Sequence, residues 1–305
     1  MLTNFPNGVS SFGMPVLGMG GGIPPTTGDV YFVHSSTGNA NNTGLTPSDA
    51  LATIDGAINK CTASQGDIII VMPGHAENIT AATSLVVDVA GISIIGLGRG
   101  RNRPVLSFTN TAGRIPVSAS NVLIENIVFY SNLADIVSGV TVSGDDVTIR
   151  GCEWAVAASN KEFLQMLDVD DGDRVTIEGC KFLAHTTAGT NTGIRFDVAH
   201  YLTIRGCEFR GDYTTAAISG TAGTAAASTD VAIIGNFIEN RDETAGMLVD
   251  VHDTGTGIIA NNHGFTLFAT NVTAPLDVGA CLNSENYVTN AVDETAVISP
   301  TTGST

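Results

Sequence analysis

The stretch VTIRGCEW occupies Val147 to Trp154, and two near copies follow it, VTIEGCKF at 175–182 and LTIRGCEF at 202–209. The copies begin 28 and 27 residues apart. Weaker relatives flank them at steps of 25 to 29 residues, namely VLIENIVF at 122–129, VAIIGNFI at 231–238 and TGIIANNH at 256–263. Repetition at a period of roughly 20 to 50 residues is typical of solenoid proteins, so the phrase marks one structural unit per coil.

Each copy alternates apolar and polar residues, which is the pattern of a half-buried strand. A second, shorter pattern precedes each copy and reads apolar, small or acidic, apolar, as in VTV at 140–142, LDV at 167–169 and FDV at 196–198. No helical periodicity lies between the two patterns. We therefore predict an all-β chain with two or three short strands per coil, stacked as a parallel β-solenoid at about 4.8 Å per coil.

Residues at equivalent positions of successive coils should form columns. One inward column is predicted to contain Cys152, Cys180, Cys207, Asn236 and Asn261. Another should be aromatic and contain Phe129, Trp154, Phe182 and Phe209. Because three of the five cysteines fall in one inward column, we expect reduced thiols that fill the core rather than a disulfide framework.

Composition argues against several classes of function. The chain has 13 Lys and Arg against 30 Asp and Glu, a net charge of −17, which disfavours nucleic acid as a partner because phosphate binding needs clustered cations. The sequence contains no apolar run of 18 residues, no basic-then-apolar leader, no phosphate loop and no dinucleotide fingerprint. We therefore expect no membrane span, no secretory signal, no cofactor and synthesis inside a cell.

The two ends of the chain differ from the repeats. Residues 1–28 are rich in Gly and Pro, have no Lys, Arg or Glu, and carry several large apolar side chains. Such a segment should form an extended arm that docks on a partner rather than a free polar tail. The expected docking residues are Phe5, Val9, Phe12, Met14, Val16 and Leu17. Residues 289–305 are interpreted as a terminal tail or a final cap.

A short helix is predicted between the arm and the repeats. It lies in TPSDALATIDGAINKC (46–61), where Thr46 is a candidate N-cap and Pro47 stands in the first turn. We expect this helix, near residues 47–61, to cap the open end of a solenoid that extends over residues 29–288.

The first part of this region resembles the N-terminal segment of pectin-lyase-like right-handed β-helices in proteins of tailed bacteriophages. The matching elements are STGN…GLTP at 36–47, ALATIDGAI at 50–58 and GDIIIVMPG at 66–74. With the coils behind it, the resemblance covers about residues 29–288. It implies a single right-handed parallel β-helix and specifies the fold more closely than the function. The arm is similar in style to the leading peptides of phage structural proteins.

Two outward columns on the repeated strand carry alternating charge. They consist of Arg150, Glu178 and Arg205, and of Glu153, Lys181 and Glu208. Each charge then has an opposite neighbour on the next coil, and such pairs stabilise a sheet face by a few tenths to about 1 kcal/mol each. We interpret both columns as structural rather than catalytic.

Acidic residues of the second pattern are the candidate catalytic groups, because the resemblance implies relatives that cleave polysaccharides with acidic pairs or with calcium and a basic residue. Asp168 and Asp197 are expected to face outward on successive coils about 5 Å apart, the separation that retaining glycosidases use. The loop DVDDGD adds Asp170, Asp171 and Asp173, which could bind Ca²⁺. A solvated acidic face is the interpretation that we favour, with catalysis and calcium binding as open alternatives.

Two classes of function follow from these observations. The first is a non-enzymatic virion structural protein, in particular a capsid decoration (cement) protein. It would form a homo-oligomer, with a trimer as the expected state, and bind the major capsid protein or another virion protein at the virion surface after synthesis in the cytoplasm of a bacterial host. The second is a tailspike-type receptor-binding protein that binds or depolymerises a host polysaccharide. The short arm and tail favour the first class, and a cellular polysaccharide lyase is a third option.

Overall fold

The computed structural model describes residues 26–187, 189–220, 227–244, 246–267 and 275–290, with three short strands outside these ranges. Those strands are β1 (Ser10–Ser11), β2 (Met14–Pro15) and β29 (Val297–Ile298). β1 and β2 pair antiparallel, as do β28 and β29. The side chains of the predicted docking residues lie outside the described part of the chain.

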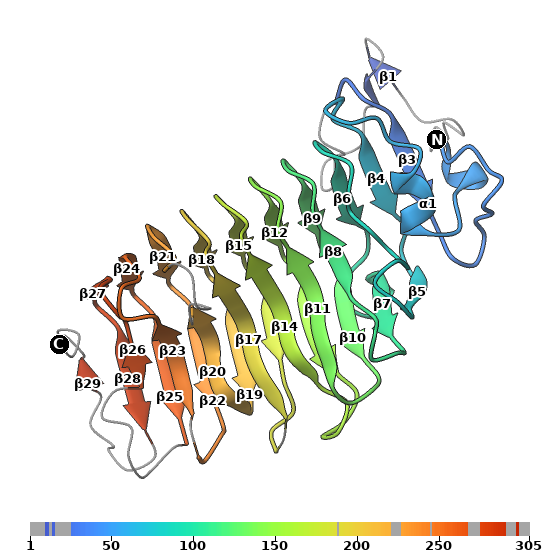
Figure 1. Cartoon of the computed structure of the whole chain (residues 1–305). Coiled ribbons are helices and arrows are strands. Elements are labelled where there is room, and N and C mark those ends of the chain that lie inside the picture. Colours follow the sequence, from blue (N-terminus) through green and yellow to red (C-terminus); the bar gives the residue numbers. More distant parts are fainter. Residues whose placement is uncertain are drawn as a thin grey trace, which may run out of the picture.

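The described chain coils into a right-handed parallel β-helix of about eight turns, which confirms the predicted fold class (Figure 1). Each full coil contributes one strand to each of three sheets, which we number in the order in which a coil passes through them. Sheet 1 contains β3 (Val30–Val33), β4 (Ile68–Val71), β6 (Ser93–Gly96), β9 (Leu123–Glu125), β12 (Thr148–Arg150), β15 (Thr176–Glu178), β18 (Thr203–Arg205), β21 (Val231–Ile234), β24 (Gly257–Ala260) and β27 (Leu282–Ser284).

The other two sheets are built in the same way. Sheet 2 contains β5 (Ala76–Ile79), β7 (Val105–Phe108), β10 (Val128–Ser131), β13 (Glu153–Val156), β16 (Lys181–Leu183), β19 (Glu208–Gly211), β22 (Phe237–Asn240), β25 (His263–Thr266) and β28 (Tyr287–Asn290), with β29 at its edge. Sheet 3 contains β8 (Ile115–Val117), β11 (Ile136–Val142), β14 (Phe163–Asp170), β17 (Thr190–Asp197), β20 (Tyr213–Gly220), β23 (Met247–Val251) and β26 (Leu276–Asp277).

The corner between sheets 1 and 2 explains the repeated phrase. The residue after each strand of sheet 1 has a left-handed backbone with φ between 54° and 66° in seven coils, at Asn126, Gly151, Gly179, Gly206, Gly235, Asn261 and Glu285. Glycine adopts this conformation without strain, and asparagine tolerates it better than most residues. One residue in this conformation turns the chain, and the residue that follows, Ile127 in the first of these corners and Cys or Asn in the others, points inward.

The predicted inward columns are present. Ile149, Ile177 and Ile204 stand in register in sheet 1. In sheet 2 the four predicted aromatic rings stack with centroids 4.6–4.7 Å apart, from Phe129 to Phe209. The three cysteines of the corner column are buried, and all five cysteines of the chain are free thiols. The narrow core is therefore filled by like side chains stacked coil on coil.

The continuation of the cysteine column differs from the prediction by one residue. The inward residue of the corner after β24 is Asn262, which is buried, whereas Asn261 is the left-handed corner residue and is exposed. The reason is that Val231 pairs with Gly257 rather than with Thr256. The buried amides of Asn236, Asn262 and Asn286 form a hydrogen-bonded ladder from coil to coil.

The helix expected over 47–61 does not form as one element. Pro47–Asp49 is a single 3₁₀ turn (η1), and the α-helix α1 is limited to Ile54–Ile58. Between them Leu51 forms a bridge to Val33 of β3, so pairing with the first strand keeps the backbone extended. The N-cap of α1 is Thr53, whose hydroxyl accepts a hydrogen bond from the amide of Gly56. Tertiary pairing thus overrides the helical pattern.

Candidate functional site

The candidate catalytic acids lie on the outer face of sheet 3. Leu167 and Val169 of β14 point into the core, so Asp168 between them faces outward. Although it faces outward, Asp168 is only 8% exposed, and so is Asp197 at the end of β17. Both acids therefore sit in a sheltered part of the face rather than on an open solvated surface.

The expected register of the two acids is wrong. Asp168 pairs with Arg195 of the next coil, and Asp197 pairs with Asp170. The motif LDV at 167–169 is therefore aligned with IRF at 194–196 and not with FDV at 196–198. The two candidate acids are thus offset along the strand and do not form a pair on successive coils.

Arg195 lies between the two acids and binds both. Its Nη1 is 2.8 Å from Oδ1 of Asp168, and its Nη2 is 3.0 Å from Oδ2 of Asp197. Burial acts to lower the pKa of Arg195, but the neighbouring carboxylates, of which Asp168 has the largest effect, raise it overall. Burial raises the pKa of Asp168 in spite of the opposite effect of Arg195. The sequence analysis missed Arg195, although its position between Ile194 and Phe196 indicates that it faces outward.

The acidic loop after β14 does not gather its carboxylates. Asp171 has a left-handed backbone with φ of 66°. A carboxylate oxygen of Asp173 accepts a hydrogen bond from the backbone amide of His200 at 3.0 Å. Within the described ranges no three His, Cys, Asp or Glu side chains are grouped so that they could hold a metal ion. The structure therefore places Asp170 at the end of β14, and Asp171 and Asp173 in the turn that connects sheet 3 to sheet 1.

A pair of acids that does occupy successive coils lies nearer the C-terminus. Asp250 of β23 pairs with Asp277 of β26. Burial, and then the neighbouring Asp277, raise the pKa of Asp250.

A groove of about 320 Å³ adjoins Asp168 on the same face. Side chains from the loop before β8, from β11 and from β14 line it, including Thr111, Arg114, Val137, Ser138, Gln165 and Asp168. Val137 is 62% exposed there, which leaves an apolar spot among hydroxyl, amide and charged groups. Such a mixed lining suits a polar ligand with apolar faces.

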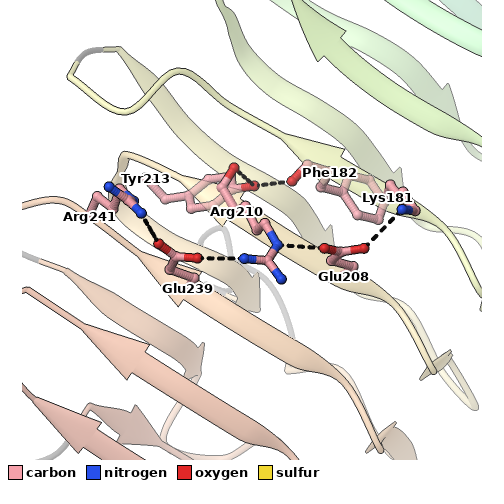
Figure 2. A network of polar contacts seen from close by, with 7 residues as sticks. All are labelled: Lys181, Phe182, Glu208, Arg210, Tyr213, Glu239 and Arg241. Atoms are coloured by element: carbon pink, nitrogen blue, oxygen red, sulfur yellow. Dashed lines mark hydrogen bonds and ion pairs between the residues drawn. The ribbon is translucent and has the colours of Figure 1, made fainter.

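The charged columns of sheets 1 and 2 have the predicted register. In sheet 1, Arg150 binds Glu125 at 2.8 Å and Arg205 binds Glu178 at 2.9 Å. In sheet 2, Lys181 binds Glu208 at 3.1 Å. Figure 2 shows how that pair continues through Arg210 and Glu239 to Arg241. These groups neutralise one another across the coils, as a structural role requires.

Replacing Arg195 with Gln is expected to destabilise the fold by about 3 kcal/mol at pH 7, because it leaves sheltered carboxylates without their cation. The pKa of Asp168 is higher in the folded chain than in the unfolded chain. The contribution of Asp168 to stability is therefore fully present below its unfolded pKa and is lost as pH rises through its folded pKa. Loss of Arg195 raises that pKa further, so the deficit should shrink as pH falls toward 4. Urea unfolding at both pH values measures this.

The control is Arg205→Gln, which breaks a pair on the exposed face of sheet 1. It should cost less than about 1 kcal/mol and vary little with pH. Equal losses for the two variants at pH 7 would contradict a special role of Arg195.

Solved structures show the same fold. A rhamnogalacturonan lyase matches with a TM-score of 0.50 and 12% identity, over 85% of this chain and 87% of the other. The Escherichia coli protein ybhc matches with a TM-score of 0.54 and 10% identity, over 93% and 90%. ORF18 of Geobacillus virus E2 gives a TM-score of 0.42 and 16% identity, over 79% of this chain and 57% of the viral one. No protein-family model and no curated protein matches the sequence.

The chain therefore has the fold of pectin-lyase-like β-helix proteins. Similarity at this level of identity shows architecture and leaves the activity to be argued from the residues of the chain itself. Among the described residues, no helix has the length and apolar character needed to cross a membrane.

Proposed function

We propose that the protein is a non-enzymatic structural component of a bacteriophage virion, a decoration protein of the capsid that residues 1–28 anchor to the particle. The observation that supports a non-enzymatic role is that the side chain of Arg195 binds both candidate catalytic acids, Asp168 and Asp197. A general acid and a nucleophile need separate protonation states and free oxygens. Here one guanidinium binds both candidate acids, at 2.8 and 3.0 Å.

The regular columns of stacked side chains support a role as a rigid structural protein on the particle surface. Stacked rings, buried amides and alternating charges repeat through the coils and hold the β-helix together. The resemblance of residues 29–288 to phage β-helices supports the virion setting. The apolar composition of residues 1–28 supports a docking arm, since a segment so rich in large apolar residues is typical of an interaction site. Copies of the chain would form a homo-oligomer on the particle surface.

Deleting residues 1–22 is expected to leave a folded β-helix that no longer joins the virion. The first described strand of the solenoid, β3, begins at Val30, so the deletion spares every coil. Prolines stiffen the arm and lower the entropy lost when it docks. Complementation of a phage lacking the protein, followed by purification of particles, measures incorporation.

The control for the deletion keeps the arm and removes only its large apolar side chains, with Phe5, Phe12 and Leu17 each replaced by Ser. This variant should also fail to incorporate while circular dichroism shows an intact solenoid. Normal incorporation of the shortened chain would disprove the docking role and leave the arm as a linker.

The groove beside Asp168 favours a second candidate function, recognition of a host surface polysaccharide in the manner of a tailspike. Its lining combines hydroxyl and amide groups with the exposed Val137. Release of reducing sugar from host polysaccharide by the purified protein, lost after Asp168→Asn and Asp197→Asn together, would establish this function and refute the non-enzymatic proposal. Unchanged virion assembly by the double variant agrees with the structural role.

A further inference from the structure

The outer face of sheet 2 changes character along the solenoid. The outward column nearest the corner runs, coil by coil, through Val105, Val128, Glu153, Lys181, Glu208, Phe237, His263 and Tyr287. The next outward column runs through Ser107, Tyr130, Ala155, Leu183, Arg210, Glu239, Phe265 and Thr289. Charges occupy the middle of the face, and apolar or aromatic residues occupy both ends.

The aromatic residues at the C-terminal end are open to solvent in a single chain. Phe237 is 42% exposed and Tyr287 is 45% exposed. The ring of His263 lies 5.3 Å from that of Tyr287, and the guanidinium of Arg210 lies 4.7 Å above the ring of Phe237. Exposed aromatic residues that gather on three successive strands mark an interaction surface.

The face is complementary to itself when a second copy is turned end over end. A twofold axis parallel to the strands, between β16 and β19, places Lys181 opposite Glu208 of the second copy. The same operation places Tyr130 opposite Phe265 and Val105 opposite Tyr287. Lys181 and Glu208 then meet at the centre, in the region that Figure 2 shows, and apolar or aromatic side chains meet at both ends. Between them, Glu153 lies opposite Phe237, Ala155 opposite Glu239 and Leu183 opposite Arg210. Self-complementarity about a twofold axis is what an isologous dimer requires.

Charge argues against two copies lying side by side in the same direction. The sequence has no Lys or Arg after Arg241, while acids continue to its end. Two copies in parallel would bring these acidic ends together, which costs free energy through like-charge repulsion. Turned end over end, each acidic end faces the N-terminal coils of the other copy, where Arg99 and Arg101 are exposed just before β7 of sheet 2.

The available area sets the strength of the contact. The eight strands from β7 to β28, at about 4.8 Å spacing, and four residues at about 3.3 Å give roughly 500 Å² per copy, or about 1,000 Å² in total. Specific interfaces of about this total area lie at the weak end of the range. A concentration-dependent dimer is therefore expected rather than an obligate one.

We propose that the outer face of sheet 2 is the contact surface of an antiparallel homodimer, centred on Lys181 and Glu208 and closed at each end by apolar side chains. The proposal specifies the homo-oligomer of the proposed function and differs from the trimer expected from the sequence. It does not involve the arm, so failure of the dimer leaves the arm-deletion test unaffected.

Site-directed crosslinking tests the orientation on the full chain. Protein with Tyr130→Cys is mixed with protein with Phe265→Cys and oxidised. The antiparallel dimer predicts a disulfide between the two variants. A parallel arrangement about the solenoid axis instead brings Phe265 opposite His263, so Phe265→Cys should then crosslink to His263→Cys. Wild-type protein, whose thiols other than Cys61 are buried, is the control and should remain uncrosslinked.

Sedimentation equilibrium tests the surface itself. The wild-type chain should dimerise over micromolar concentrations, and Phe265→Ser with Tyr287→Ser, which removes the aromatic side chains opposite Tyr130 and Val105, should weaken the dimer at least about tenfold. Val137→Ser on the groove of sheet 3 is the matched control, since it removes an exposed apolar side chain from another face and should leave the dimer unchanged. A monomer at all concentrations, a trimer, or crosslinking only of the parallel pair would overturn the proposal.

Discussion

Replacing Ile177 with Asp is expected to prevent the β-helix from folding. Ile177 is fully buried and stacks between Ile149 and Ile204. Loss of the packed side chain costs about 2–5 kcal/mol, and burial of a carboxyl group among apolar neighbours costs several kcal/mol more. The sum is comparable to the whole stability of a typical domain, about 5–15 kcal/mol. Circular dichroism with urea titration should show no cooperative unfolding transition.

The same substitution on the neighbouring residue is the control. Thr176 belongs to the outward column that also contains Thr148 and Thr203. Thr176→Asp adds the same carboxyl group one residue away on the other face of β15, where water can solvate it. We expect a cooperative transition shifted by less than about 1 kcal/mol. Cooperative unfolding of the Ile177 variant would show that the inward column does not determine the fold.

Sheets 1 and 2 could be predicted from the sequence because one short phrase holds both strands and the corner between them. The corner uses a single left-handed residue in each of these coils, so the spacing from Ile149 to Trp154 is the same as that from Ile177 to Phe182. A constant spacing fixes the register of both strands at once. The charged and aromatic columns of these two sheets were therefore predicted correctly, and so was the cysteine column except for Asn261, whose place Asn262 takes.

Sheet 3 was predicted less well because a longer connection precedes it. The motifs LDV at 167–169 and FDV at 196–198 look equivalent, but Val198 has a left-handed backbone with φ of 49° and lies in the turn beyond β17. Spacing to the next strand of sheet 1 gives the correct register. Val169 precedes Val175 by six residues, and Phe196 precedes Leu202 by the same number. Local similarity of three residues is thus weaker evidence than the length of a turn.

The candidate site changed with this register. With the expected alignment, Asp168 and Asp197 would repel each other and one of them could act as an acid. With the observed alignment, Arg195 stands opposite Asp168 and binds both carboxylates. A shift of two residues in one strand therefore turns a candidate catalytic pair into an ion cluster. The sequence analysis identified the acidic residues of β14 and β17 correctly, but it did not identify the residue that lies opposite each of them.

The second substitution with a large expected effect on stability lies in the hydrogen-bonded ladder of Asn236, Asn262 and Asn286. Oδ1 of Asn262 accepts hydrogen bonds from the backbone amide and from Nδ2 of Asn236, at 3.0 and 2.9 Å. Nδ2 of Asn262 donates to the carbonyl of Ile233 and to Oδ1 of Asn286, both at 2.9 Å. All of these groups are buried in the corner between sheets 1 and 2. The side chain of Asn262 thus connects three successive coils.

Asn262→Ala should therefore destabilise the β-helix by about 4 kcal/mol, because each buried polar group left without a partner costs about 1–3 kcal/mol. Asn261→Gly is the control one residue away. Asn261 is exposed and has a left-handed backbone that glycine also adopts, so its replacement should change stability by less than about 1 kcal/mol. Urea unfolding of the two variants distinguishes the residue that the repeat pattern predicts from the one that the structure shows. A larger loss for Asn261→Gly would mean that the pairing of Val231 with Gly257, and with it the register of the last coils, is wrong.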